Sequence, residues 1–213
     1  MDWILIFLIG LFIGSFLNVC IYRIPREESI VFPGSHCPQC QSPVKAMDLV
    51  PVMNWLWLRG RCRHCQASIS LRYPMVELFS AVLLVGIYMQ AGLSVNFLFF
   101  VVLACLLMVI SLIDLDHQMI PDGLTILVAA AGITRLLLGR LSGQGLTLGE
   151  AALGVLIGGG FFLLIAVLTG GGMGGGDIKL VAALGLWVGW TGMLVLMLLA
   201  LTPSPKRPQL VSS

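Results

Sequence analysis

Six long apolar blocks dominate the sequence and constrain its fold more than any other feature. A helix needs about 20 mostly apolar residues to cross a bilayer, and blocks close to that length occupy residues 3–22, 75–93, 95–113, 124–138, 151–168 and 180–201. Because the apolar residues run continuously instead of alternating, a transmembrane β-barrel is disfavoured. We therefore predict an all-α polytopic membrane protein with about six transmembrane helices. The last block contains Gly189 beside Trp190 and is either one helix or two shorter ones.

The scarcity of charge supports this prediction. Only 10% of the residues are charged and the mean hydropathy is +1.01, whereas a soluble domain carries about 25% charged residues. A soluble enzyme and a secreted disulfide scaffold are therefore excluded, and the lipid bilayer is an expected partner. The net charge of only +2 gives no reason to expect a nucleic-acid partner.

Basic residues predict the orientation and the division of the chain. Seven of the twelve Lys and Arg residues lie in the polar insert at 23–74, and positive charge favours the cytoplasmic side. We expect a first transmembrane helix at 1–22, a cytoplasmic zinc-binding insert at 23–74 and a transmembrane core at 75–201. The residues at 202–213 are polar and Pro-rich, and we expect a disordered tail there.

Two CxxC pairs lie in this insert and predict a structural metal site. Cys37 and Cys40 are separated from Cys62 and Cys65 by 21 residues, a spacing typical of tetrahedral zinc bound by four thiolates. Disulfides are disfavoured in a reducing cytoplasm, and a redox centre needs only one pair. His36 and His64 are adjacent to the cysteines and remain alternative ligands, although we expect them to be bystanders. Because the insert is too polar to form a core, zinc binding is expected to supply much of its folding free energy.

Carboxylates next to the apolar blocks suggest chemistry, because ionisable groups near membrane depth are costly. Asp114 follows the third block, and Asp177 follows the glycine-rich segment 170–176. The predicted topology places both on the cytoplasmic face. Two carboxylates at one site can share a proton, so that one acts as acid and the other as base on a water molecule. The more specific interpretation is an intramembrane aspartyl hydrolase. The alternative for Asp177 is a structural role as a helix cap.

A non-catalytic membrane protein is the alternative from another functional class. An assembly factor or a cation-coupled carrier would use the same carboxylates to bind a cation. Carriers usually place such carboxylates near the bilayer midplane between internal repeats. Here they lie at one predicted face, and the sequence shows no repeat of this kind.

Five motifs, in order along the chain, resemble those of the type IV prepilin peptidases, a branch of the GxGD aspartyl proteases. They are Gly14-Ser15-Phe16-Leu17-Asn18-Val19-Cys20 followed by Tyr22-Arg23-Ile24-Pro25, the twin CxxC insert, Arg72-Tyr73-Pro74-x-x-Glu77, Asp114-Leu115-x4-Ile120-Pro121, and Gly174-Gly175-Gly176-Asp177. The match extends from about residue 10 to residue 200. The twin CxxC insert argues against the archaeal preflagellin and presenilin-like types of GxGD enzyme.

The resemblance implies roles for individual residues. Asp114 and Asp177 match the two catalytic aspartates, and Pro121, Gly174 and Gly176 belong to the supporting motifs. Asp116 lacks the required spacing to Ile-Pro and is a decoy. In the family, these aspartates remove the short basic leader of type IV prepilins or type II secretion pseudopilins, typically at a Gly-Phe junction. The resemblance also implies the bacterial inner membrane, with the active site facing the cytoplasm.

A second activity is implied by the resemblance alone. Many members methylate the new amino terminus with S-adenosylmethionine, and Glu77 is a candidate residue for that reaction. A contact inside the bundle, to Arg72 or Arg23, is the simpler interpretation of Glu77. The family usually continues with one or two further apolar helices, where this sequence has a polar segment from Thr202.

Overall fold

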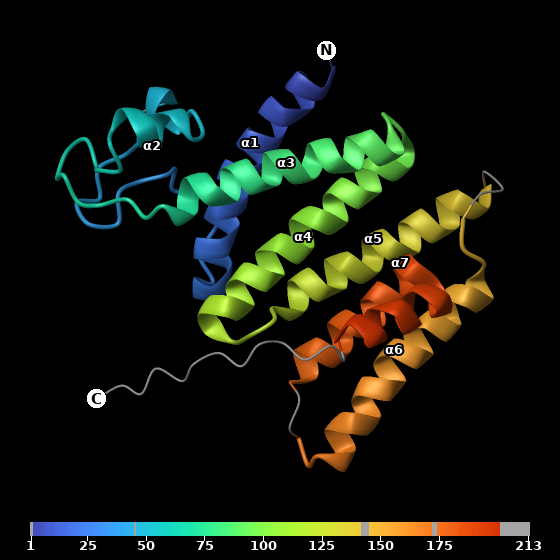
Figure 1. Cartoon of the computed structure of the whole chain (residues 1–213). Helices are drawn as coiled ribbons and strands as arrows, with labels where there is room; N and C mark the ends of the chain where they lie inside the picture. Colours follow the sequence, from blue (N-terminus) through green and yellow to red (C-terminus); the bar gives the residue numbers. More distant parts are fainter. Residues whose placement is uncertain (1, 45, 142–144, 172–173, 201–213) are drawn as a thin grey trace. The chain divides into compact units, whose positions relative to one another are not determined.

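The computed structural model describes residues 2–44, 46–141, 145–171 and 174–200 (Figure 1). The expected tail at 202–213 lies outside these residues. The helices are α1 (Asp2–Arg23), η1 (Ile24–Arg26), η2 (Ala46–Leu49), α2 (Met53–Trp57), α3 (Arg72–Ala91), α4 (Val95–His117), α5 (Asp122–Leu141), α6 (Leu148–Leu168) and α7 (Gly175–Ala200). Strand pairing in the described residues is limited to two isolated bridges in the insert.

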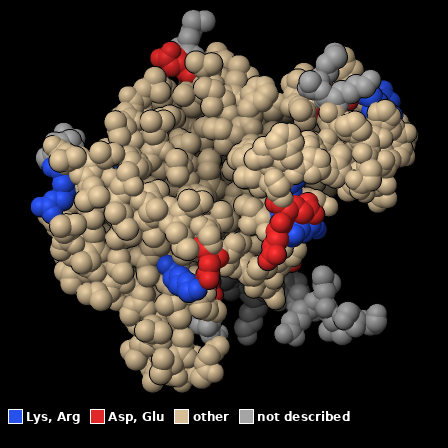
Figure 2. All heavy atoms as spheres, turned by 180° about the vertical axis from the view of Figure 1, so that it is seen from behind, with Lys and Arg blue, Asp and Glu red and all other residues tan. Residues whose placement is uncertain are grey.

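The predicted fold class is confirmed. Six of the described helices, α1 and α3 to α7, are long and apolar enough to cross a membrane. Large apolar side chains such as Leu5 and Phe12 are about 60% exposed, as lipid-facing positions require. Figure 2 shows how few charged side chains reach one face of the molecule. The chain is therefore a multi-pass α-helical membrane protein.

The chain divides into two compact units, residues 1–124 and 125–213, and each is described by itself. In the first unit, α1 packs against α3 and also touches α4 (Figure 1). The approach of α1 to α3 is close at Gly14, where an added Cβ would lie 2.6 Å from the Cα of Glu77. A small residue at this position therefore allows the N-terminal motif to lie directly against Glu77.

The second unit is built mainly from α6 and α7, which pack along one another. Gly189 within α7 has φ 66° and ψ −174°, a conformation essentially restricted to glycine, so that the last span consists of two helical segments joined at a kink. Arg135, a charge inside the α5 span, donates a hydrogen bond to the carbonyl oxygen of Trp187 and lies 5.8 Å from the centre of its ring. These contacts explain how a span can contain an arginine.

Candidate functional site

The two CxxC loops of the insert fold in the same way, at an interval of 25 residues. The backbone N–H of Cys37 donates to the carbonyl oxygen of Ser42 at 3.0 Å, and that of Cys62 donates to Ala67 at 2.8 Å. The residue after the second cysteine of each loop has a left-handed backbone, with φ 58° at Gln41 and 59° at Gln66. Each loop thus turns tightly and presents two sulfur atoms toward the other loop.

The four predicted cysteines form one cluster. The Sγ atoms of Cys37, Cys40, Cys62 and Cys65 all lie within 4.8 Å of one another, and those of Cys37 and Cys65 are 3.8 Å apart. Tetrahedral zinc with Zn–S bonds of about 2.3 Å would separate its sulfur ligands by about 3.8 Å. The spacing and chemistry of these groups therefore fit structural zinc.

The histidines beside the cluster have other contacts. Nδ1 of His36 lies 3.1 Å from the carbonyl oxygen of Gly34. His64 contributes a backbone hydrogen bond that lowers the pKa of the Cys62 thiol, after the larger effect of Cys65. The metal-type cluster within the described residues contains only the four cysteines, which agrees with the expectation that the histidines are bystanders.

The thiols of the cluster differ in acidity. Hydrogen bonds from the hydroxyl and backbone of Ser42 lower the pKa of Cys40 to about 6. At Cys65 a backbone hydrogen bond from Ala67 acts in the same direction, but desolvation and the neighbouring thiols raise its pKa to about 11. A bound divalent cation would remove this difference in acidity, because it would stabilise all four thiolates at once.

A small hydrogen-bonded framework connects the cluster to the rest of the insert. Arg63 binds the carboxylate of Asp48 through two nitrogens, with Nε at 2.9 Å from Oδ2, and Asp48 raises the pKa of Arg63. The indole N–H of Trp55 donates to the carbonyl oxygen of Ile69 at 3.0 Å. These contacts hold the second CxxC loop against the segment that contains α2.

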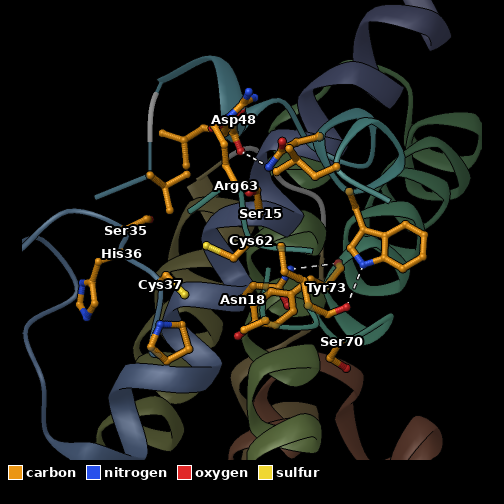
Figure 3. A pocket seen from close by; sticks show the side chains of 18 of the residues that line it. Ser15, Asn18, Ser35, His36, Cys37, Asp48, Cys62, Arg63, Ser70 and Tyr73 are labelled. Atoms are coloured by element: carbon orange, nitrogen blue, oxygen red, sulfur yellow. Dashed lines mark hydrogen bonds and ion pairs between the residues drawn. The ribbon is translucent and has the colours of Figure 1, made fainter. Parts of the chain in front are cut away.

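A cavity of about 440 Å³ lies where the insert meets α1 and α3 (Figure 3). Ser15 and Asn18 line it from α1, and Tyr73 lines it from the start of α3. Cys37 and Cys62 line it from the two CxxC loops, so that the metal-type cluster forms part of its wall. The amide of Asn18 donates to the carbonyl oxygen of Tyr73 at 3.1 Å and thereby joins the ends of the two helices.

Glu77 lines the same cavity and is buried, but the two arginines expected as its partners bind elsewhere. Its Oε2 accepts a hydrogen bond from the backbone N–H of Val52 at 2.7 Å. Arg72 instead donates to Asp116 and to the carbonyl oxygen of Leu112. Arg23 donates to three carbonyl oxygens, those of Ser29, Pro33 and Gly34. The expected contact of Glu77 with Arg72 or Arg23 is therefore wrong. Arg72 binds the end of α4, whereas Glu77 and Arg23 bind backbone groups of the insert.

The first candidate aspartate lies in the last turn of α4. Asp114 is exposed, and its carbonyl oxygen accepts from Gln118, whose left-handed backbone ends the helix. No hydrogen bond or ion pair involves the Asp114 carboxylate in the part of the chain that the structure describes. Asp116 forms an ion pair with Arg72, and the carbonyl oxygen of Pro121 accepts from Leu124 in the first turn of α5. The decoy thus has a structural contact, whereas the carboxylate of Asp114 is accessible.

The second candidate aspartate, Asp177, is half-buried in the first turn of α7 in the other unit. Its carboxylate folds back toward the preceding glycine segment, and a Cβ added to Gly174 would lie 3.0 Å from its Oδ2. Gly176 occupies the same first turn. A carboxylate here also interacts favourably with the helix dipole, so that the cap interpretation remains compatible with the geometry.

If Asp177 has the catalytic role that the resemblance implies, Gly174→Ala is expected to reduce peptide cleavage by roughly tenfold, because the new methyl group would displace the Asp177 carboxylate. Gly175→Ala is the matched control, since nothing lies within 4 Å of the Cβ that it would add. Initial rates of substrate cleavage in detergent measure the effect. Equal rates for the two variants would show that the position of this carboxylate is unimportant.

Several groups at the site have no separate signal in the sequence. Val52 has φ 61° in spite of its branched Cβ, and the residues around it in the sequence do not predict this backbone conformation. The Asp48–Arg63 pair joins residues that are 15 positions apart. Asn18 is the exception, because a polar residue inside an apolar block is itself a signal.

Two family models match the chain in sequence order. The bacterial peptidase A24 N-terminal domain matches residues 8–91, and the type IV leader peptidase family matches residues 101–203. No solved structure matches the chain.

Three relatives support the same assignment. The chain is 39% identical to the prepilin leader peptidase/N-methyltransferase of Aeromonas hydrophila, over 92% of this chain and 76% of the relative. It is 40% identical to the protein of the same name from Klebsiella pneumoniae, over 92% of this chain and 89% of the relative. It is 39% identical to the type 4 prepilin-like proteins leader peptide-processing enzyme of Escherichia coli O78:H11, over 84% of this chain and 74% of the relative. These matches favour an enzyme over the non-catalytic alternative, and the chain belongs to the type IV leader peptidase family.

Proposed function

We propose that this enzyme removes the short basic leader of type IV prepilins or type II secretion pseudopilins at a Gly-Phe type junction. The observation that carries the proposal is the 39–40% identity to relatives with this leader-processing activity in their names. The substrate would be cut at the cytoplasmic face of the bacterial inner membrane. The positive charge of the insert supports that orientation.

Asp114 and Asp177 are the proposed catalytic pair. The ionised carboxylate takes a proton from a water molecule, whose oxygen attacks the scissile carbonyl carbon, while the protonated carboxyl donates to the carbonyl oxygen. Proton transfer to the leaving nitrogen then allows the C–N bond to break. The accessible carboxylate of Asp114 and the position of Asp177 beside Gly174 support these roles.

The insert at 23–74 and the core at 75–201 then have different roles. We propose that Cys37, Cys40, Cys62 and Cys65 hold structural zinc, which orders the insert and takes no part in peptide cleavage. The core provides the two aspartates. A closed site of four sulfur ligands has no open position for water or substrate, which supports a structural role.

Methylation of the new amino terminus is the proposed second activity, supported by the names of the relatives. S-adenosylmethionine supplies an electrophilic methyl group: its S–CH₃ bond breaks as the N–CH₃ bond forms, a proton leaves the amine, and a thioether remains. Glu77 is the candidate residue of this chain for that reaction.

The test uses the zinc-loaded protein in detergent and a prepilin with a basic leader and a Gly-Phe junction. Mass spectrometry of the product, with and without S-adenosylmethionine, is expected to show loss of the leader and, with the cofactor, addition of one methyl group. A folded protein that leaves the prepilin intact would contradict the proposed peptidase function. Cleavage without methylation would contradict only the second activity.

A further inference from the structure

We propose that the short helix α2 anchors the insert in the lipid interface, on the insert's side of the bilayer. The outer side chains of α2 contact acyl chains there, and the arginines that follow it contact anionic headgroups. Neither leader cleavage nor methylation is needed for this role, so that the inference goes beyond the proposed function.

The helix α2 has two unlike faces. Asn54 and Trp55 line the cavity and donate hydrogen bonds to backbone carbonyl oxygens of the insert. Met53, Leu56 and Trp57 do not line the cavity, and they are 56%, 59% and 85% exposed. Residues three and four positions apart are neighbours on a helix surface. Three large apolar side chains therefore form one outward face, which the described part of the chain does not cover.

The level of α2 along the spanning helices places this face inside their ends. Val52, the residue before α2, donates to Oε2 of Glu77 at 2.7 Å. Glu77 lies five residues after Arg72, the start of α3, and thus about 7 Å along the helix axis. Gly14 of α1 packs against the same residue, nine residues before Arg23 at the end of α1, which is about 13 Å along that axis. The segment that begins α2 therefore lies beside two spanning helices and not beyond them.

The surface of α3 at this level is already of the lipid-facing kind. Met75 and Phe79, two residues before and after Glu77, are 65% and 60% exposed. Exposed apolar side chains on a spanning helix face lipid. An interfacial segment buries its apolar side chains about 5–10 Å into the boundary between headgroups and acyl chains, and tryptophan is enriched in that zone. The outward face of α2, with Trp57 as its most exposed side chain, suits this environment.

The charges next to α2 favour lipid over a pilin substrate as the partner. The helix ends in a left-handed turn, with φ 50° at Arg59 and 67° at Gly60, and the N–H of Gly60 donates to the carbonyl oxygen of Trp55 at 2.8 Å. Arg59 and Arg61, on either side of Gly60, are exposed, and within the described residues neither has an acidic partner. Anionic headgroups attract such cations at the membrane surface, whereas a basic leader would be repelled by them.

Tryptophan fluorescence of the full zinc-loaded chain in lipid nanodiscs tests the proposal, with phosphatidylethanolamine, phosphatidylglycerol and brominated phosphatidylcholine as the lipids. The difference in emission between the wild type and Trp57→Phe belongs to Trp57. Bromine near the headgroup end of the acyl chain is expected to lower this emission by about twofold or more, whereas iodide in the buffer is expected to have little effect. Trp55→Phe is the matched control, because Trp55 lies in the same helix but lines the cavity, and its emission should respond less to brominated lipid.

A second measurement needs no variant and decides the question if thermal melting shows that Trp57→Phe fails to fold. The wild-type protein is crosslinked to a photoactivatable phosphatidylglycerol and digested with trypsin. The peptide at 46–59 contains α2 and is expected to carry the lipid. The peptide at 64–72, from the second CxxC loop, is expected to carry none.

Two results would overturn the proposal. The first is Trp57 emission that iodide quenches and brominated lipid does not, together with an unlabelled peptide at 46–59, because α2 would then lie in water. The second is quenching by iodide that only an added prepilin relieves, because the face would then bind substrate in place of lipid. Neither measurement depends on turnover. An inactive protein whose α2 contacts lipid would therefore contradict the proposed function alone, and an active protein whose α2 lies in water would contradict this inference alone.

Discussion

Asp114→Asn and Asp177→Asn are each expected to lower the rate of leader cleavage by about 10²–10⁴-fold, the contribution typical of a positioned acid or base. Asparagine has nearly the same shape as aspartate but neither takes up nor releases a proton at neutral pH. Each change therefore removes proton transfer while leaving the helix ends largely unaltered. The rate of appearance of the shortened pilin, measured by mass, gives the size of the effect.

Asp116→Asn is the control for these variants. It lies two residues from Asp114 in the same helix turn, and its carboxylate forms an ion pair with Arg72 in which both side chains are more than a third exposed. An exposed pair contributes about 0–1 kcal/mol, so that cleavage is expected to fall by no more than about fivefold. A larger loss in this variant than in Asp114→Asn would show that Asp116, and not Asp114, has the first catalytic role.

Removal of one zinc ligand is the second change for which we expect a large effect. It should abolish metal binding and disorder the insert, while the rate of leader cleavage should be largely unchanged. In Cys62→Ala the metal content per chain is expected to fall to near zero. The insert should then become sensitive to limited proteolysis, because structural zinc contributes about 10–16 kcal/mol in small metal-dependent domains. Loss of order at this wall should also remove the cavity, while cleavage of the leader continues.

Cys105→Ala provides the comparison for the zinc-ligand variant. Cys105 lies in α4, outside the four-cysteine cluster, and its loss should leave both metal content and protease resistance unchanged. Chelation that stops leader cleavage while the insert stays protease-resistant would contradict the separation between zinc and catalysis. Metal analysis, proteolysis and cleavage rates are therefore best measured on the same preparations.

The features that the sequence predicts here are those in which the signal is local. An apolar block determines a span almost by itself, and each CxxC pair needs only a tight turn to bring its sulfurs together. Gly189 was recognisable as a break for the same reason, since glycine can adopt the backbone angles found there. The choice between one helix and two required the structure.

The contacts of Glu77 depend instead on residues far away in the chain. Val52 in the insert donates to it although the two residues are 25 positions apart in the chain. The positive φ of Val52 is not one that a valine would be expected to adopt. A charge-pairing argument favours an arginine partner for a buried glutamate. Arg72 is already engaged by Asp116, however, and Arg23 by backbone carbonyls. Such competition between partners is decided by tertiary structure, and no spacing rule expresses it.

The position of Arg72 has a consequence for how the insert and the proposed catalytic site relate. It is the first residue of α3, where the insert passes into that helix, and it binds the end of α4 at Leu112 and Asp116, on either side of Asp114. A shift of the insert would therefore move the segment that contains Asp114, one of the two proposed catalytic carboxylates. The order of the insert and the geometry around Asp114 are then coupled through one side chain. The coupling is weak because the Arg72–Asp116 pair is exposed, in keeping with leader cleavage that continues when the insert loses its zinc.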